Sequence, residues 1–394
     1  MTAVLEGIRV LDFGRYIAGP FCACLLADMG ADVIRVERLE GSEDRFIAGV
    51  SETGEGGSFM QLNRNKRGLT LDPMTPGGRE VVARLAATAD VVVANLPLPT
   101  LKAMGIDYET LCKSRPDIIL THVSAFGNAG PYADRVGFDL SGQGMSGMAY
   151  MSGSEEQPVR SQINYVDFST ALFAAYGTLA ALMARAKSGR GQIVEASLFT
   201  SSIALANNFI VEQAVRGLNR KPHGNRGHHA APNDIFATRD GWIVAMVVGN
   251  PLFERWAKLM GETHWLGEPR YATDGGRGEH QQEINDRMAR WCAERTTAQA
   301  IRELDAARVP AGPVYTPADV LEDPHVKACG ILKDVDYPGL PKPAPLADTP
   351  VRLSDTPGGI RHRAPRIGEH TDEVLGALGY SPSEIAGLRE RRVV

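Results

Sequence analysis

The stretch "IRVLDFGRYIAGPFCACLLADMGADVIRVE", residues 8–37, decides the fold class. It opens with an apolar run at 8–13, passes through a glycine-containing turn into a helical pattern at 19–30, and ends in a second apolar run at 32–37. Pro20 in the first turn and Gly30 just past the end are the asymmetry typical of a helix. Two strands joined by a helix predict a βαβ unit with parallel strands.

The alternation continues through the first 130 residues. Further strands are predicted at 67–72, 90–96 and 117–127, with a helix at 76–89. These strands are Val/Ile/Leu runs without strict alternation, as strands covered on both faces should be. We therefore predict an α/β fold with a Rossmann-like, mostly parallel sheet and helices on both sides.

A second region follows a long loop at 217–236 that has no hydrophobic period. A hairpin is expected at 235–248 and helices near 251–260, 279–295 and 297–307. We predict a large domain from residues 1–200 plus 330–394, a smaller α/β domain at 225–325, and linkers at 200–225 and 325–350. Loops as long as 217–236 are usually linkers or functional segments.

Composition narrows the function classes. The 394 residues carry a formal net charge of −5 and 43% apolar residues, which disfavours a nucleic-acid-binding surface. The most apolar segment, 168–184, is interrupted by Ser, Thr, Tyr and Gly and is interpreted as a buried helix, so no membrane span is expected. The N-terminus lacks a secretory pattern, and five cysteines without framework spacing favour a reducing compartment, so a cytoplasmic protein is expected.

Residues that follow the predicted strands mark a ligand edge. The turn with Gly14 and Gly19 follows the first strand, Glu37 and Arg38 follow the second, and Asn95 begins the segment after the fourth. Ligands of open α/β sheets bind outside the carboxyl ends of strands, and a helix N-terminus with an Arg suits phosphate. A phosphorylated nucleoside fits, although both standard nucleotide fingerprints are missing. Turn geometry and a solvated strand end are the alternatives for these residues.

Asp167 stands at the head of the apolar helix that follows it. An Asp N-cap stabilises a helix by about 1 kcal/mol, and this is the structural alternative. The helix dipole would also keep the carboxylate ionised, and a positioned, ionised Asp can act as a nucleophile. No metal pattern is present, because His228 and His229 are adjacent and no spaced ligand set accompanies them.

Motifs along almost the whole chain resemble those of the class III coenzyme A transferases, the CaiB/BaiF family that includes formyl-CoA transferase and carnitine CoA-transferase. The matching segments are "VLDFGRYIAGP" (10–20), "GADVIRVER" (30–38), "NRNKRGLTLD" (63–72), "DVVVANL" (90–96), "GFDLSGQGMSG" (137–147), "NYVDFSTALFAAYGTLAAL" (164–182), "SGRGQIVEASL" (188–198), "GPVYTPADVLEDPHV" (312–326) and "IGEHTDEVLGALGY" (367–380). The resemblance implies that Asp167 is the catalytic nucleophile. It also implies CoA contacts at Tyr16, Ile17, Ala18, Arg38, Lys66, Leu71, Asn95 and Leu96.

Some positions depart from the family pattern. A family Gln after the position of Tyr16 is replaced by Ile17, and a family Arg is absent, with Lys102 as a possible substitute for phosphate binding. The glycine-rich loop over the active Asp would correspond to "GNRGHH" (224–229). We expect Gly224 and Gly227 to be its flexible points, and His228 or His229 is a candidate for a remote carboxylate.

The related α-methylacyl-CoA racemases resemble this chain closely but use a His–Asp acid–base pair. Their His falls on Phe138, and a phenyl ring cannot transfer a proton, so transfer is favoured over racemisation. Asp139 remains as a polar neighbour with a turn or cap role as its alternative.

The family resemblance implies an acyl-CoA and a small carboxylic acid as substrates, with no permanently bound cofactor, and an interlocked homodimer. A racemase or isomerase of the same fold is the alternative function, and a nucleotide-dependent oxidoreductase is a more distant one.

Overall fold

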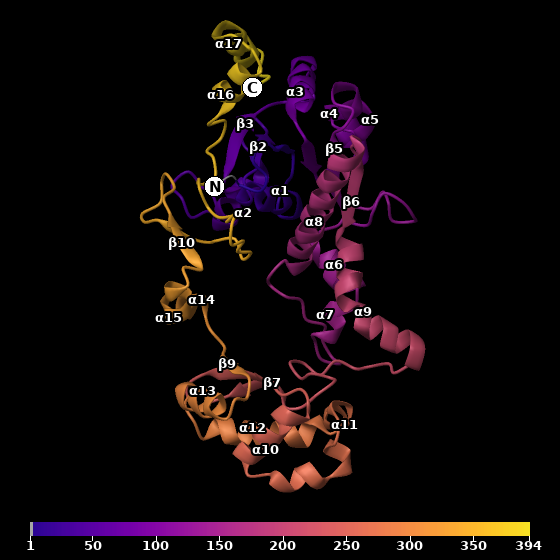
Figure 1. The fold of residues 1–394 in the computed structure, drawn as a ribbon, viewed down its shortest axis with the longest axis vertical. Coiled ribbons are helices and arrows are strands. Elements are labelled where there is room, and N and C mark those ends of the chain that lie inside the picture. Colours follow the sequence, from indigo (N-terminus) through magenta and orange to yellow (C-terminus); the bar gives the residue numbers. More distant parts are fainter. Residues whose placement is uncertain (1–2) are drawn as a thin grey trace. The chain divides into compact units, whose positions relative to one another are not determined.

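The computed structural model describes residues 3–394, and this part of the chain divides into two compact units (Figure 1). The first comprises residues up to Ser146, Ser161–Val211 and Lys327–Val394, and the second comprises Gly147–Arg160 and Glu212–Val326. Residues 147–160 thus differ from the predicted boundaries, because they group with the second unit. The expected linkers also contain regular structure, namely α9 (Leu198–Arg216), α15 (Pro324–Ala328) and the hairpin of β10 (Leu332–Val335) and β11 (Ala344–Ala347).

A six-stranded sheet is the centre of the first unit. Its strands are β1 (Arg9–Asp12), β2 (Asp32–Glu37), β3 (Lys66–Thr70), β4 (Val91–Ala94), β5 (Ile119–Ser124) and β6 (Ile193–Ser197). The order is β3-β2-β1-β4-β5-β6, and every neighbouring pair is parallel. The predicted α/β class with a Rossmann-like parallel sheet is confirmed.

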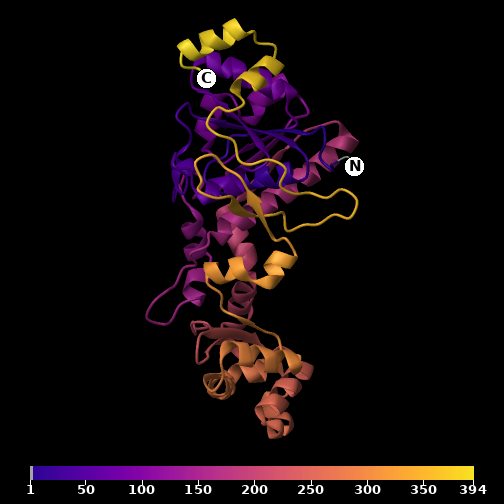
Figure 2. The same cartoon turned by 90° about the vertical axis from the view of Figure 1, so that its left-hand side faces the viewer.

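Alternate residues of the central strands supply two separate cores. Leu11 of β1 and Val92 of β4 belong to one, and Val10 and Val93 belong to the other. The helices around the first core are α3 (Pro76–Thr88), α4 (Leu98–Met104), α5 (Tyr108–Ser114), α16 (Thr371–Ala377) and α17 (Pro382–Glu390). The second core is covered by α1 (Ala18–Asp28) and α8 (Tyr165–Ser188). Both views place α16 and α17 beside α3 (Figures 1 and 2).

Helix α8 is the one helix among residues 3–394 that is long and apolar enough to cross a membrane by length and composition alone. Its small residues Ala171, Ala174 and Ala175 are buried against the sheet side in the second core. One face of α8 therefore belongs to this core, while other large apolar side chains of the helix, such as Tyr176 and Met183, are exposed.

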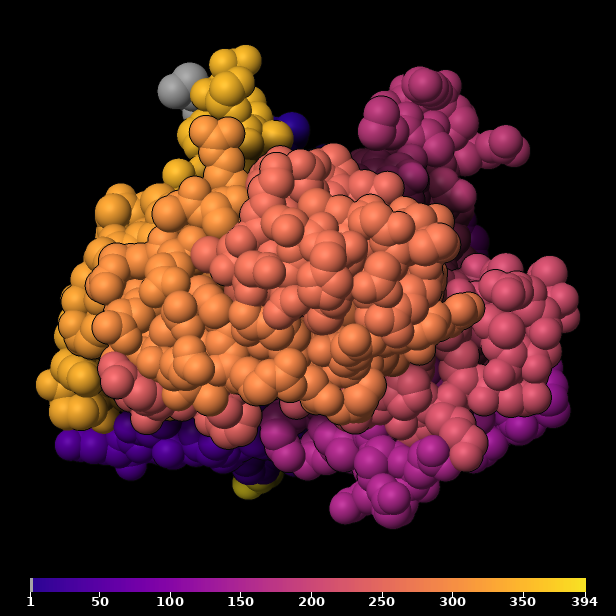
Figure 3. Space-filling view, turned by 90° about the horizontal axis from the view of Figure 1, so that it is seen from below, coloured from indigo at the N-terminus to yellow at the C-terminus, as the bar shows by residue number. Residues whose placement is uncertain are grey.

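The second unit contains the predicted hairpin, β7 (Asn233–Ala237) with β8 (Trp242–Met246), extended by β9 (Ala311–Pro313). Its helices include α7 (Met148–Met151), α10 (Asn250–Met260), α11 (Asp274–Glu279), α12 (Gln281–Ala293), α13 (Thr297–Ala306) and α14 (Pro317–Glu322). Trp256 and Met288 lie in a core of their own. The orange residues of this unit form a rounded surface in the space-filling view (Figure 3).

The first unit also contains two short helices near the sheet, α2 (Gly57–Asn63) and α6 (Asp139–Met145). Helix α2 supplies Phe59 and Met60 to a small core with Leu346 of β11. Burial of Leu346 explains why part of the expected 325–350 linker is ordered, because the hairpin removes an apolar side chain from water.

Candidate active site

The order of strands creates a switch point between β1 and β4. Helix α1 follows β1 onto one face of the sheet, while α4 and α5 follow β4 onto the other. The carboxyl ends of the two strands therefore diverge and leave a crevice, which is where ligands bind in open α/β sheets. The side chain of Asn95 links the two ends, since its Oδ1 accepts the N–H of Arg15 at 2.7 Å and its Nδ2 donates to the Arg15 carbonyl at 2.8 Å.

A cavity of about 1110 Å³ opens at this point. Its lining includes most of the residues for which a CoA contact was predicted, together with the predicted nucleophile: Tyr16, Ile17, Ala18, Arg38, Leu71, Asn95, Leu96 and Asp167. Lys66 and Lys102 are not among the lining residues. One connected space therefore brings together side chains from the ends of β1, β2, β4 and the start of α8.

The turn between β1 and α1 has little room for side chains. A Cβ on Gly14 would lie 2.7 Å from Asp12 Oδ1 and 2.7 Å from the ring of Pro20. Tyr16 adopts a left-handed backbone with φ of 62°, an uncommon conformation for a non-glycine residue that often accompanies functional sites. The turn thus needs a glycine at position 14 and directs Tyr16 to the cavity.

Asp167 occupies the third position of α8, and the N-cap is Asn164. The N-cap alternative for Asp167 is therefore wrong. The residue is only 9% exposed, yet it lines the cavity. Burial, and next the charge of Asp139, raise the pKa of Asp167 from 3.8 to about 7. The expectation that the helix dipole keeps this group fully ionised is corrected, because desolvation and a neighbouring acid oppose the dipole.

Asp139 holds the start of α8. Its Oδ2 accepts the backbone N–H of Asp167 at 2.9 Å, and its Oδ1 accepts a hydrogen bond from Gln143 Nε2 at 2.5 Å. Gln143 in turn accepts the N–H of Ser161 through Oε1 at 2.9 Å. Asp139 is itself 2% exposed. This chain of buried hydrogen bonds fixes the backbone that carries Asp167 and places a second carboxyl group near it.

Phe138 presents its ring to the same cavity and is 63% exposed. Its ring packs edge-to-face on Tyr16, with centroids 5.7 Å apart. Tyr16 and Phe138 therefore form an aromatic pair in the lining of the cavity.

Lys66 lies under the β1–α1 turn. Its Nζ donates to Asp12 Oδ2 at 2.7 Å, to the Pro20 carbonyl at 2.8 Å and to Asn63 Oδ1 at 2.9 Å, and the side chain is buried. These three acceptors use all three ammonium donors. The structure therefore gives the Lys66 side chain a role in fixing the turn, in place of the predicted direct contact to CoA.

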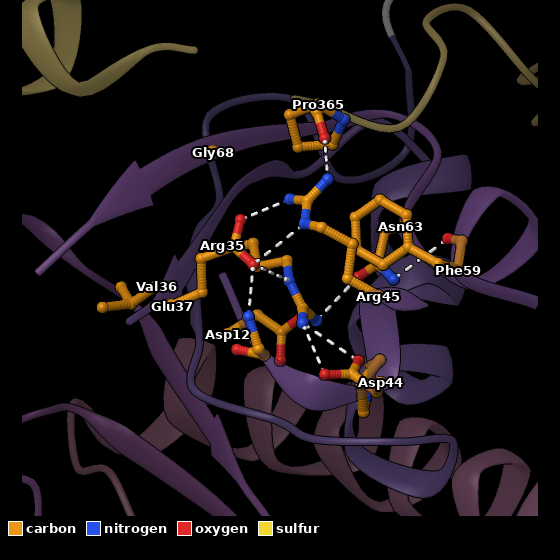
Figure 4. Close-up of polar contacts among 12 residues, drawn as sticks. Asp12, Arg35, Val36, Glu37, Asp44, Arg45, Phe59, Asn63, Gly68 and Pro365 are labelled. Atoms are coloured by element: carbon orange, nitrogen blue, oxygen red, sulfur yellow. Dashed lines mark hydrogen bonds and ion pairs between the residues drawn. The ribbon is translucent and has the colours of Figure 1, made fainter. Parts of the chain in front are cut away.

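The buried charges continue behind β2. Arg35 donates to both carboxylate oxygens of Asp44, and Arg45 pairs with Glu37 and donates to the Pro365 carbonyl (Figure 4). Buried ion pairs are tolerated only when partners and hydrogen bonds satisfy them. Glu37, which was expected at the ligand edge, is buried in its ion pair with Arg45. The neighbouring Arg38 lines the cavity.

Several cavity residues were missed by sequence reasoning. These are Arg15, His122, Arg135, Arg391 and Arg392. Arg15 donates to the carbonyls of Phe13, Gly14 and Val36. The two C-terminal arginines lie in no motif, and only the path of the chain after α17 brings them to the strand ends.

The predicted loop 224–229 belongs to the second unit. Gly224 donates its N–H to the Gly153 carbonyl, and a Cβ on Gly227 would lie 1.9 Å from the side chain of Asn233. Gly227 is thus required by close packing, which is a different role from the flexible point expected. Burial lowers the pKa of His228 to about 4, while His229 Nε2 lies 2.8 Å from Glu212 Oε1.

A sequence model of CoA-transferase family III matches residues 5–371, so the chain belongs to this family. Two similar relatives come from Chloroflexus aurantiacus. Succinyl-CoA–D-citramalate CoA-transferase is 37% identical, with 99% of this chain and 98% of that protein covered, and the beta subunit of succinyl-CoA–L-malate CoA-transferase is 34% identical, with 100% and 98% covered. The formyl-CoA:oxalate CoA-transferase of Rhodopseudomonas palustris is 33% identical, with 99% and 97% covered.

Among solved structures, a CaiB/BaiF family protein from Brucella suis superimposes with a TM-score of 0.83 at 32% identity, with 96% of this chain and 100% of that chain covered. The resemblance inferred from the motifs is confirmed, and the protein is a family III CoA-transferase.

Proposed function

We propose that the enzyme moves coenzyme A from an acyl-CoA donor to a carboxylic acid, with Asp167 as the nucleophile. The observation that carries this proposal is a buried carboxyl group that lines a cavity at the switch point of the sheet. The same cavity is lined by residues at which the family resemblance implies CoA contacts, among them Tyr16, Arg38 and Asn95.

The reaction proceeds through acyl exchange on Asp167. Its carboxylate attacks the donor thioester carbonyl and the C–S bond breaks, which gives a mixed anhydride and CoA thiolate. The thiolate attacks the aspartyl carbonyl, releases the donor acid and leaves an aspartyl-CoA thioester. The acceptor carboxylate then attacks this thioester, forming a second anhydride and thiolate. Attack of the thiolate on the acceptor acyl carbonyl yields the new acyl-CoA and regenerates the Asp167 carboxylate.

The environment of Asp167 suits this role. Only the ionised carboxylate is a nucleophile, and a pKa of about 7 leaves roughly half of the groups ionised at neutral pH. Burial removes hydration that would otherwise stabilise the ionised oxygen, so the carboxylate is more reactive than one in water. Retention of the thiolate in the cavity makes its return to the aspartyl carbonyl an effectively intramolecular step.

For the substrates, we propose succinyl-CoA as donor and a small dicarboxylic acid as acceptor. The support is that two relatives from Chloroflexus aurantiacus are a succinyl-CoA–D-citramalate CoA-transferase and a subunit of a succinyl-CoA–L-malate CoA-transferase. A screen of carboxylic acids with succinyl-CoA and acetyl-CoA, followed by mass spectrometry of the thioesters, identifies the pair.

We also propose that the loop 224–229 acts as a lid, with His228 or His229 as the contact to the remote carboxylate of a diacid. The family resemblance supports this assignment. Replacement of either His by Ala should change the preference among acceptor acids, and an unchanged preference for both variants would remove the assignment.

The quaternary structure that we propose is an interlocked homodimer. Large apolar side chains lie exposed on α8 and α9, including Tyr176 (73%), Met183 (67%) and Val215 (78%). Such residues on neighbouring helices favour a protein interface. Sedimentation of a monomer at micromolar concentration would count against this arrangement.

The test of function is Asp167→Ala. We expect it to abolish transfer and to leave CoA binding and folding intact, because Asp167 is one small part of a large cavity. Solvent deuterium uptake at the acyl α-carbon of a CoA thioester, without an acceptor acid, would instead favour a racemase or isomerase.

A further inference from the structure

The C-terminal residues are fixed against the sheet. After α17 ends, the Val393 carbonyl accepts the N–H of Asp72 at 2.8 Å, and the Val393 N–H donates to the Leu388 carbonyl at 2.9 Å. The Val393 side chain is 3% exposed and belongs to the first core. A Cβ on Gly77 would lie 3.2 Å from it. Two hydrogen bonds and a buried side chain therefore position the last residues at the end of β3.

This anchor directs two arginines to the cavity. Arg391 and Arg392 both line it, beside Arg38 and Thr75. Arg392 has a left-handed backbone with φ of 54°, and its Nη2 donates to Glu40 Oε1 at 3.0 Å. Within residues 3–394, no carboxylate lies at ion-pair distance from Arg391. Arg391, which lines the cavity without such a partner, is a candidate for anion binding.

The two arginines near Arg391, namely Arg38 and Arg392, each form an exposed ion pair. Arg392 pairs with Glu40, and Arg38 pairs with Glu43 at 2.5 Å, with more than half of each side chain exposed. Exposed ion pairs contribute little, so a phosphate can displace these carboxylates. Arginine also binds phosphate by two parallel hydrogen bonds, which a single exposed carboxylate does not prevent.

The distance of Arg391 and Arg392 from Asp167 indicates which part of CoA they can contact. Asp167 lies at the start of α8, which packs over β5 and β6, whereas Val393 is tied to the segment after β3. In the order β3-β2-β1-β4-β5, four strand spacings of about 4.8 Å separate these places, or roughly 19 Å. The thioester must reach Asp167, so the opposite end of an extended CoA, its adenosine 3′-phosphate, falls near the C-terminus.

We infer that Arg391, assisted by Arg392, binds the 3′-phosphate of CoA and makes the C-terminus a determinant of specificity for CoA over its dephosphorylated form. This inference rests on the proposed function for the orientation of CoA. Arg135 is the competing cation. It lines the cavity on the β5 side, where its guanidinium stacks on Tyr132 at 4.6 Å, and it is placed for the part of CoA nearer the thioester.

The test is the affinity of the whole protein for CoA and for 3′-dephospho-CoA, measured by titration calorimetry. We expect wild type to prefer CoA by roughly tenfold to a hundredfold, the range for hydrogen bonds to a charged group. Arg391→Ala should lose most of this preference and bind 3′-dephospho-CoA within about twofold of wild type, because the lost interaction is specific to the phosphate. The matched control is Arg389→Ala, since Arg389 pairs with Asp372 and does not line the cavity.

Two results would overturn the inference. One is an equal loss of affinity for both ligands in Arg391→Ala, which would assign the arginine to another part of CoA. The other is a preference kept in Arg391→Ala and in the Arg391→Ala/Arg392→Ala pair but lost in Arg135→Ala. The readout does not require turnover, so selective CoA binding in a protein without transferase activity would refute the proposed reaction and leave this inference standing.

Discussion

Replacement of Asp139 by Asn tests how the cavity tunes the pKa of Asp167, the proposed nucleophile. The pKa of Asp167 rises from 3.8 to about 7, first through burial and second through the charge of Asp139. This difference corresponds to about 4 kcal/mol against ionisation. Asp139→Asn removes the second cause and keeps the first. It also retains one oxygen that can accept the Asp167 N–H, which Asp139 Oδ2 accepts at 2.9 Å.

The expected result is a displacement of the acid limb of the pH profile. Two charges a few ångströms apart at an effective dielectric constant near 20 interact by a few kcal/mol, so we expect the midpoint to fall by about one pH unit or more. It should stay above 3.8, because burial remains. At pH 5.5 the ionised fraction of Asp167, and with it kcat/KM relative to the plateau, should rise about tenfold.

The assay is kcat/KM for CoA transfer from succinyl-CoA between pH 4.5 and 9. Asp134→Asn is the matched control, because Asp134 is an exposed acidic residue in the lining of the same cavity. Among residues 3–394, Asp134 accepts no hydrogen bond from α8, whereas Asp139 accepts the N–H of Asp167. Its profile should keep the wild-type midpoint. A uniform loss of activity in Asp139→Asn with an unmoved midpoint would refute electrostatic tuning and reduce Asp139 to a structural support.

Further predictions concern stability and the turn. Asp167→Asn should raise Tm at pH 8, because it removes up to about 4 kcal/mol that ionisation of the buried carboxyl group costs the folded state. The folded pKa exceeds the unfolded one, so wild-type stability falls as pH rises from 3.8 to about 7. The gain in Tm should therefore vanish near pH 4. Lys66→Met should lower the free energy of unfolding, measured in urea, by about 3–5 kcal/mol, because the buried Asp12 loses its ion-pair partner. The control is Lys102→Ala at an exposed site, which should change the free energy of unfolding by less than about 0.5 kcal/mol. Gly14→Ala should raise KM for acyl-CoA several-fold, since its Cβ would lie 2.7 Å from Asp12 and Pro20 and displace the turn; an unchanged KM would contradict the packing.

The sheet and its ligand edge could be predicted because their signals are local. The apolar runs at 8–13, 32–37 and 90–96 each encode a strand, and residues 8–37 contain a complete βαβ unit. The carboxyl ends of parallel strands share one edge, so Asn95 and Arg38 could be assigned to the same edge without coordinates. The strand order, and therefore the switch point, depends on pairing between segments distant in the chain, so these local signals do not predict it.

The electrostatics of the site could not be predicted, because they depend on residues distant in the chain. Asp139 lies 28 positions before Asp167, and Lys66 lies 54 positions after Asp12. A sequence shows that Lys66 is basic, but not that three buried acceptors enclose its ammonium. The N-cap was predicted at the wrong residue for a similar reason, since α8 begins three residues earlier than the apolar pattern at 168–184 indicates.

Trapping of the acyl-enzyme tests directly whether Asp167 is the nucleophile. The protein is incubated with succinyl-CoA, treated with hydroxylamine or borohydride during turnover, digested and mapped by mass spectrometry, with Asp167→Asn as the blank. We expect a hydroxamate or a reduced side chain at Asp167 in wild type and no modified carboxyl group in the blank. Turnover that leaves Asp167 unmodified under trapping conditions, or a modification at another carboxylate, would contradict it.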